Sequence, residues 1–165
     1  MKKAILIFFI IPFITLTGFS QTITQDSLTG KYQSQGIKKI DSLLSKGEIY
    51  SRTNEWIALN FKSSNDVIQL ADKETGKIIG KGSFKTNMFM KEGWIEYTFL
   101  LEFKDGKIRY TYTDFFYSSV GSGRMAFEGS MISKKKVIQT TEENIKSSLS
   151  NLKTYIKQSV GNKDW

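Results

Sequence analysis

The sequence contains no histidine and no cysteine, and it has a single proline among its 165 residues. Without cysteine the chain forms no disulfide, offers no thiolate to a zinc ion and carries no lipid on an N-terminal cysteine. Without histidine it has no Ser-His-Asp triad and no imidazole to act as a metal ligand or as a base near neutral pH. The two absences remove the commonest routes to hydrolytic and zinc-dependent catalysis.

The residues that are present are sufficient for a folded, basic domain. Hydrophobic residues make up 39% of the chain and aromatic residues 13%, which is enough for a packed core and unlike a disordered protein. The length is typical of one domain. Lys and Arg exceed Asp and Glu by 24 to 16, so the formal net charge is +8. Such an excess attracts anionic partners in general.

Residues 1–20 have the three-part pattern of a secretory signal peptide. The basic residues Lys2 and Lys3 precede an apolar run over 4–14, and small residues lead to a cleavage site after Ser20. An uncleaved anchor is the alternative, but the run is short for a spanning helix of about 20 residues. We therefore predict an exported protein, periplasmic or secreted and not a lipoprotein, with no integral membrane segment after cleavage.

The remaining chain divides into a polar start and one domain. Residues 21–35 are rich in Ser, Thr, Gln and Gly, which predicts a flexible lead-in. Residues 36–165 then form the predicted single domain. Its first segment, 36–44, fits either a short strand or the start of a helix.

A helix and two strands are predicted next. Ser45 and Glu48 have the spacing of a capping box, and apolar residues at helical spacing follow, so we expect a helix over 46–61. The periodicity then changes to that of strands, over 67–71 and 77–85. The alternation in the second strand places three lysines on one face.

The clearest local pattern is a hairpin around Asp105-Gly106, a dipeptide typical of tight two-residue turns. Pairing outward from this turn places Glu102 opposite Arg109. The same register gathers the apolar residues on the other face: Ile95, Tyr97, Phe99, Leu101, Phe103, Ile108, Tyr110 and Tyr112. If the alternation continues, Asp114 lies on that aromatic face opposite Tyr97, whereas Trp94 and Phe115 lie on the polar face.

The C-terminal part predicts a second helix. Residues 118–123 are expected as a loop, 125–132 as a further strand or an edge segment, and 134–136 as a basic turn. Thr140 and Glu143 repeat the capping-box spacing. The apolar stripe that follows consists of Ile145, Leu149, Leu152, Ile156 and Val160. Together the elements predict an α+β two-layer sandwich, with an antiparallel sheet of four to six strands and two helices on one face.

No pattern for catalysis, a cofactor or a metal stands out. Glu96 and Glu102 lie about 20 Å apart on one strand, too far for a glycosidase pair. Gly80 and Gly82 do not fit a phosphate-binding loop, and we expect them to leave space on the inner sheet face for a large helix residue such as Trp56. We therefore expect no enzyme; a hydrolase that uses carboxylates or an oxygen-ligated metal remains the last alternative.

Two segments resemble a known family. Residues 48–82 contain Trp56-Ile57-Ala58 on the predicted helix and Thr75-Gly76-Lys77-Ile78 at a turn, and residues 107–114 form a strand with alternating Tyr and Thr. This pattern resembles a family of secreted Gram-negative bacterial proteins described as a domain of unknown function with a TBP-like fold. The resemblance implies a β-α-β4-α order and favours a strand at 37–43. It supplies no catalytic or ligand residues, and it does not imply DNA binding, because a fold does not carry a function.

The leading functional hypothesis is a non-catalytic domain that binds a protein or an envelope component. Its candidate surface is the outer sheet face, with Lys81, Trp94, Arg109 and Phe115. An exposed aromatic residue such as Trp94 is unexpected on a purely solvated face. No nucleic-acid partner is expected, and the oligomeric state stays open.

The alternative is a carrier of a small apolar ligand. Its pocket would lie between the sheet and the C-terminal helix and be lined by Tyr97, Phe99, Tyr112, Asp114 and Ile156. A cavity of roughly 300 Å³ or more between these layers would favour the carrier, and a solid core would exclude it.

Overall fold

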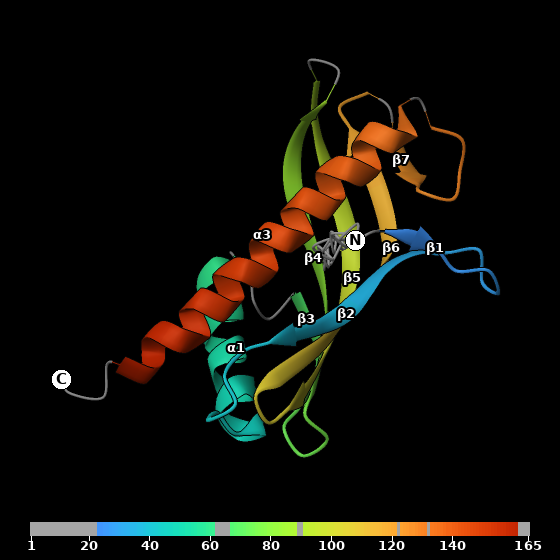
Figure 1. Ribbon diagram of the computed structural model, residues 1–165. Helices are drawn as coiled ribbons and strands as arrows, with labels where there is room; N and C mark the ends of the chain where they lie inside the picture. Colours follow the sequence, from blue (N-terminus) through green and yellow to red (C-terminus); the bar gives the residue numbers. More distant parts are fainter. Residues whose placement is uncertain (1–22, 62–66, 89–90, 122, 132, 162–165) are drawn as a thin grey trace, which may run out of the picture.

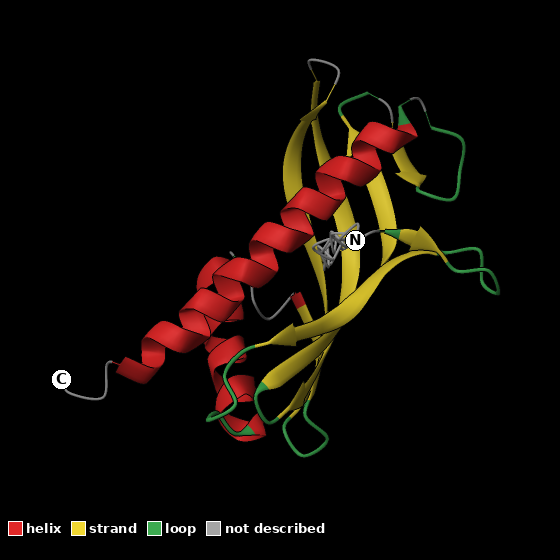
Figure 2. Ribbon diagram, viewed as in Figure 1, coloured by secondary structure: helices red, strands yellow, loops and turns green. Residues whose placement is uncertain are grey.

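The fold consists of an antiparallel sheet with two helices against one of its faces (Figure 1; Figure 2). The computed structural model describes residues 23–61, 67–88, 91–121, 123–131 and 133–161. The elements in chain order are β1 (Thr24–Gln25), β2 (Tyr32–Lys39), α1 (Lys46–Asn60), β3 (Ile68–Asp72), β4 (Lys77–Met88), β5 (Lys91–Lys104), β6 (Lys107–Ser119), β7 (Gly123–Ala126) and α3 (Lys134–Gly161). The predicted α+β sandwich is confirmed. The cleavage site predicted after Ser20 lies outside the described residues.

The strand order is β1-β2-β6-β5-β4-β3, and β7 pairs with β6. The long hairpin of β5 and β6 thus lies in the middle of the sheet. Strand β3 pairs with the first part of β4, and the two helices lie side by side over the inner face (Figure 1). The core fills the space between this face and the helices.

The first helix begins where the capping box predicts. The Ser45 hydroxyl accepts a hydrogen bond from the Glu48 amide at 3.3 Å, and the Glu48 carboxylate accepts one from the Ser45 amide at 3.0 Å. These two bonds satisfy amides that have no partner inside the helix. The helix buries Ile49, Thr53, Trp56 and Ile57 against the sheet and α3.

The predicted flexible lead-in is wrong for the described part of 21–35. Strand β1 pairs Thr24 with Gln33 of β2, and β2 begins at Tyr32. Ile23 is buried, although few apolar residues surround it in the sequence. Backbone pairing with β6 supplies the order here, and that pairing needs no apolar pattern. The strand implied at 37–43 therefore exists, but it begins earlier and ends at Lys39.

The hairpin register is confirmed from the turn outward until it meets a β-bulge. Glu102 lies opposite Arg109, and Thr98 lies opposite Thr113. Between Glu96 and Thr98 the register shifts, so that two residues of β6 face one residue of β5. Asp114 takes a positive φ of 52° at this bulge. An extra residue in one strand reverses the alternation beyond it.

The bulge overturns the predicted placement of two residues. Phe115 was expected on the polar face, but it is completely buried, and Phe116 takes the outward position. Asp114 was expected on the aromatic face; instead its carboxylate lies 2.6 Å from the ammonium group of Lys31. The predicted alternation holds only as long as each residue of one strand faces one residue of the other.

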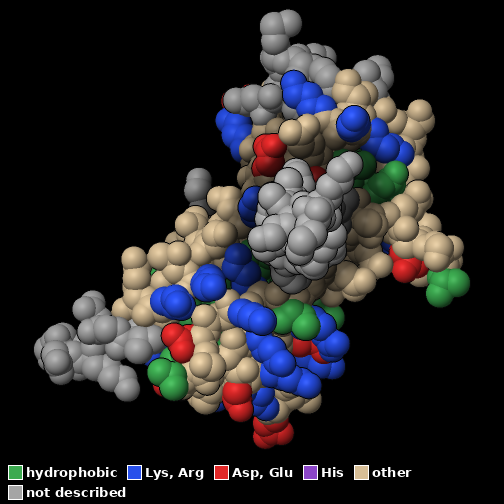
Figure 3. Space-filling view, viewed as in Figure 1, with side chains coloured by type: hydrophobic (Ala, Val, Ile, Leu, Met, Phe, Trp, Pro, Cys, Tyr) green, Lys and Arg blue, Asp and Glu red, His purple; other side chains and the backbone are tan. Residues whose placement is uncertain are grey.

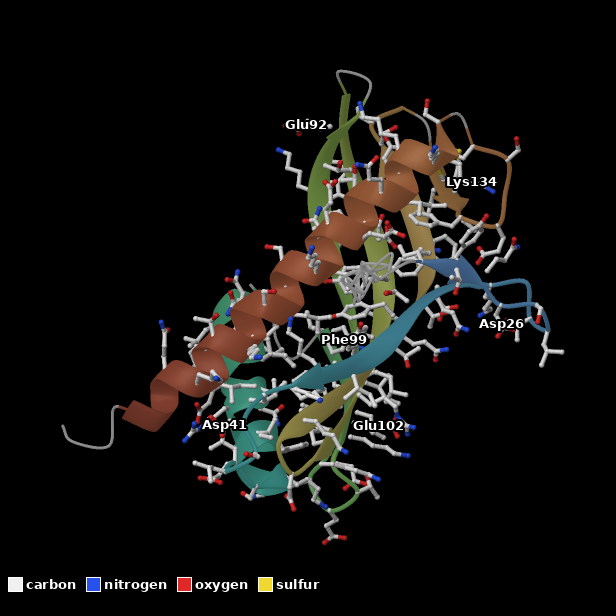
Figure 4. All side chains as sticks on the ribbon, viewed as in Figure 1. Asp26, Asp41, Glu92, Phe99, Glu102 and Lys134 are labelled. Carbon is white, nitrogen blue, oxygen red and sulfur yellow. The ribbon has the colours of Figure 1, made fainter. Side chains whose placement is uncertain are left out.

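The glycines of β4 make space for rings of the neighbouring strand, not for Trp56. Gly80 lies opposite Phe99 and Gly82 opposite Tyr97. A Cβ atom at Gly82 would lie 2.6 Å from the Tyr97 hydroxyl, and one at Gly80 would overlap the Phe99 ring. The rings therefore extend across β4, and Phe99 lies in the middle of the molecule (Figure 4).

The second helix begins six residues before the predicted start. Lys134–Lys136, expected as a basic turn, form its first turn, and Thr140 lies inside the helix. The burial of Val137 and Thr141 accounts for the extension. The predicted apolar stripe is confirmed for its described side chains, since Ile145, Leu149, Leu152 and Ile156 are buried.

Candidate binding site at the open edge of β4

In the part of the chain that the structure describes, no strand pairs with the outer edge of the second half of β4. Strand β3 pairs with β4 from Lys77 to Gly80, and among the described residues the rest of β4 pairs only with β5. The Phe103 amide donates to the Gly76 carbonyl at 2.9 Å, so the even-numbered residues of β4 bond to β5. Beyond Gly80, the backbone groups of the odd-numbered residues, including Ser83, therefore point away from β5.

A hollow of about 870 Å³ lies beside this edge. Its outer part is formed by the sheet face that the helices leave uncovered. The lining residues are Asn60, Phe61, Val67, Lys81, Gly82, Ser83, Lys85, Trp94, Glu96, Tyr97, Thr98, Asp114, Phe116 and Arg124. The hollow thus combines exposed rings, hydroxyl groups and charges of both signs.

The outer part of the hollow is organised around one arginine. The guanidinium carbon of Arg124 lies 3.4 Å from the centre of the Phe116 ring, and its Nε atom lies 2.9 Å from a Glu96 carboxylate oxygen. Trp94 is 37% exposed nearby. Strand β7 brings Arg124 to this position by pairing with β6.

A cleft of about 260 Å³ lies on the inner side of the same edge, between α1, α3 and β4. Its lining residues are Trp56, Asn60, Phe61, Ser83, Phe84, Tyr97, Tyr112, Asn144, Ile145, Ser147, Ser148 and Asn151. None of these residues is charged. The cleft and the hollow share Asn60, Phe61, Ser83 and Tyr97, so they lie on the two sides of one strand edge.

Tyr97 lies where the cleft and the hollow meet. Its side chain reaches across Gly82 and is only 9% exposed, and burial raises its pKa to about 12. Burial also raises the pKa of the neighbouring Tyr112, while a hydrogen bond with Ser148 opposes that rise. Both phenols are therefore neutral hydrogen-bonding groups at physiological pH.

The burial of Tyr97 predicts a loss of stability in alkali. In the unfolded chain the Tyr97 pKa is about 10, so between pH 10 and 12 only the unfolded form ionises. The free energy of unfolding should fall over this window, by about 2–3 kcal/mol from Tyr97 alone. Urea unfolding at pH 8 and pH 11 measures the first half of the loss, about 1.4 kcal/mol at one pH unit above the unfolded pKa. Tyr97→Phe should lose less stability over this range than the wild type; an equal loss in both proteins contradicts the assignment.

Most charges around the hollow are paired. Lys85 lies 2.6 Å from Glu92, and Asp114 lies 2.6 Å from Lys31. Beside a separate hollow, Arg109 binds Glu102 through two nitrogens at 2.6 and 2.8 Å. The Arg109 hydrogen bonds lower the pKa of the Glu102 carboxyl. Glu92 and Glu102 lie at opposite ends of β5 (Figure 4). Lys81 is exposed and has no ion pair within the described part of the chain.

Other lysines and arginines lie on the face that carries α3, where burial and the charges of Lys153 and Lys146 lower the pKa of Lys38. On this face they are spread over the helix, the end of β2 and the upper end of the molecule (Figure 3). Lys81 and Lys85, by contrast, flank the open edge directly.

The structure brings together only some of the predicted site residues. Lys81 and Trp94 line the hollow, whereas Arg109 lies beside a separate hollow of about 200 Å³ with Ile37 and Lys107. Phe115 is in the core, so Phe116 replaces it at the site.

Of the proposed carrier pocket, Tyr97 and Tyr112 line the cleft. Asp114 lies in the outer hollow, and Phe99 and Ile156 are buried away from the cleft. The cleft between the sheet and the helices thus contains two of the five residues predicted for the carrier pocket.

The predicted site residues do not include Arg124, Phe116, Phe61 or Ser83. Ser83 could have been found, since it lies between two lysines on the outward face of a predicted strand. Arg124 and Phe61 reach the site through strand pairing and helix packing, which leave no local pattern in the sequence.

The described residues contain no cluster of three or more acidic side chains positioned to hold a metal ion. Within the same residues no helix is long and apolar enough to cross a membrane.

Comparison with known proteins places the fold. Residues 36–118, half of the chain, match the model of a domain of unknown function (DUF4468) with TBP-like fold. The chain belongs to this family. Comparison with curated proteins finds no match.

Two solved structures resemble this DUF4468 protein. A TBP-like protein from Parabacteroides distasonis ATCC 8503 is 13% identical with a TM-score of 0.67, over 81% of this chain and 97% of the other. A DUF4468 family protein from Bacteroides ovatus ATCC 8483 is 13% identical with a TM-score of 0.61, over 78% of this chain and 89% of the other. At this identity the likeness concerns the fold alone.

Proposed function

We propose that this DUF4468 protein is an exported, non-catalytic binding domain that takes an extended segment of a cell-envelope protein on the open edge of β4. The observation that carries the proposal is the second half of β4, where Lys81, Ser83 and Lys85 direct outward backbone groups that pair with no other described strand. Unpaired strand edges bind extended peptides by adding a strand to the sheet. Space on both sides of the edge leaves room for side chains of the added strand.

Export is supported by the pattern of residues 1–20, in which two lysines precede an apolar run and a small-residue cleavage site. A binding function is supported by the residue types at the site. Exposed rings and paired charges provide contact surface, whereas Glu96 and Asp114 are each held by a cation. A carboxylate held in an ion pair is better suited to orienting a bound segment than to transferring a proton.

A carrier of small apolar ligands is less well supported. The inner cleft of about 260 Å³ is smaller than the roughly 300–1,000 Å³ of pockets that enclose such ligands. Half of its twelve lining residues are asparagines or serines, which offer hydrogen-bonding groups to a polar ligand. The cleft has a suitable size for one side chain of an added strand.

Blocking the edge is expected to abolish peptide binding. Octapeptides enriched by phage display on the mature chain, residues 21–165, should bind at least about tenfold more weakly to Ser83→Pro. Proline at this position removes one outward amide and leaves the bonds to β5 in place. The matched control Ser83→Thr keeps the amide and should bind as the wild type does. Fluorescence anisotropy with labelled peptides measures the affinities.

A second measurement leaves the protein unchanged. Methylating alternate backbone amides of an enriched peptide should abolish binding when the methylated amides face β4, and should preserve it when they face solvent. The proposal fails if the selection enriches no peptide, or if the enriched peptides bind equally to Ser83→Pro and tolerate methylation in both registers.

A further inference from the structure

We infer that the segment bound on β4 carries two acidic side chains four residues apart on its outward face, and between them an uncharged hydrogen-bonding side chain that enters the inner cleft. This inference rests on the proposed function, because it describes the chemistry of the same strand-edge site. It follows from the alternation of side chains along β4 and from the different linings of the two faces.

The outward face selects acidic residues. Lys81 and Lys85 are exposed on this face and lie four residues apart on β4. On an antiparallel added strand, the residues opposite them are also four apart and point to the same face. Lys81 has no acidic partner in the described part of the chain, and Lys85 has only the exposed Glu92. Carboxylates on the added strand would complement both ammonium groups.

The inward face selects an uncharged side chain. The residue opposite Gly82 points toward the inner cleft, where Gly82 itself presents no side chain. The cleft has no charged lining residue, and a charged group placed there would lose hydration without gaining a partner.

The Tyr97 hydroxyl provides the hydrogen-bonding group of the cleft. It has no hydrogen-bond partner among the described residues, although the Tyr97 side chain is 9% exposed. Every fully buried side-chain nitrogen or oxygen in the same residues has a partner, so this hydroxyl is still accessible from the cleft. A threonine, asparagine, glutamine or tyrosine side chain of the bound strand can therefore hydrogen-bond to it.

A second copy of this chain fits the edge less well. If two β4 edges paired antiparallel about Ser83, Lys81 of each copy would lie opposite Lys85 of the other. Like charges directly opposite each other destabilise strand pairs. Lysines on an exposed edge also oppose pairing between identical chains in general. The charge of the edge thus favours an acidic segment from a different protein.

Charge exchange between protein and peptide tests the outward face. We expect Lys81→Glu to weaken binding of an enriched peptide about tenfold at low salt, and Glu→Lys at the facing peptide position to restore it. The matched control Lys73→Glu, an exposed lysine in the turn before β4, should leave the affinity unchanged. Tyr97→Phe should weaken a peptide with threonine at the inward position and leave the corresponding valine peptide unaffected.

The outcomes separate this inference from the proposed function. If enriched peptides require the edge but show no acidic pair and no response to Lys81→Glu, the inference is overturned and strand addition stands. If binding is insensitive to Ser83→Pro and to backbone methylation, both are overturned. A dimer in sedimentation experiments that Ser83→Pro dissociates would identify a second copy as the occupant and would also overturn the inference.

Discussion

Phe115→Ala is expected to lower the free energy of unfolding by about 3–5 kcal/mol, the range for removing a buried phenylalanine ring. Phe115 is completely buried and stacks on Phe127, with ring centres 5.2 Å apart. The Phe127 amide also donates to the Phe115 carbonyl at 3.0 Å, so the two rings are fixed by the backbone. Replacing either ring by a methyl group leaves a cavity that the surrounding strands can fill only in part. Urea unfolding followed by tryptophan fluorescence measures the effect.

Phe116→Ala is the matched control, since the same residue type is removed one position along the strand. Phe116 lies on the outer face beneath Arg124, and its loss removes a cation–π contact of about 0.5–1 kcal/mol. A large difference between the two variants is expected only if the bulge at Asp114 reverses the alternation. An equal loss of stability in both variants, or a larger loss in Phe116→Ala, would support the uninterrupted register and contradict the bulge.

The β5–β6 hairpin shows how far local sequence determines this fold. Asp105-Gly106 fixes the turn, and a slip by one residue would move every ring to the other face, so one register alone buries them all. Alternation along β4 and β5 correctly places Lys81 and Trp94 outward, because the extra residue of the bulge lies in β6 and does not disturb these two strands. Patterns of this kind predict structure because residues that face each other across the hairpin are buried or exposed together.

The errors arose where the structure depends on distant parts of the chain. The bulge at Asp114 has no local mark other than two consecutive phenylalanines, and either ring could have been buried. Strand β1 is held by pairing with β2 and by the Ile23 amide, which donates to Glu142 of α3 at 2.7 Å. The start of α3 likewise depends on Val137 reaching the core. Arg124 enters the site only because β7 pairs with β6.

Removing α3 is expected to abolish cooperative folding of the whole domain. A chain that ends at Thr140 loses the buried residues Thr141, Ile145, Leu149, Leu152 and Ile156. The four large apolar residues each contribute about 2–5 kcal/mol to stability, so their joint loss of roughly 8–20 kcal/mol is comparable to or larger than the roughly 5–15 kcal/mol that holds a typical domain folded. The truncated protein should show no sigmoidal unfolding in urea and should expose apolar surface that binds a hydrophobic dye.

The truncation also removes polar contacts that α1 and the sheet make with α3. Arg52 of α1 donates to the Ile156 carbonyl at 2.8 Å, and Tyr112 of β6 is hydrogen-bonded to Ser148. Without α3 the aromatic rings on the inner sheet face, including those of Tyr97 and Tyr112, would face water. A chain that ends at Gly161 keeps every one of these contacts and should unfold cooperatively. If the chain that ends at Thr140 also unfolds cooperatively, the sheet is stable without α3 and the inner cleft cannot depend on that helix.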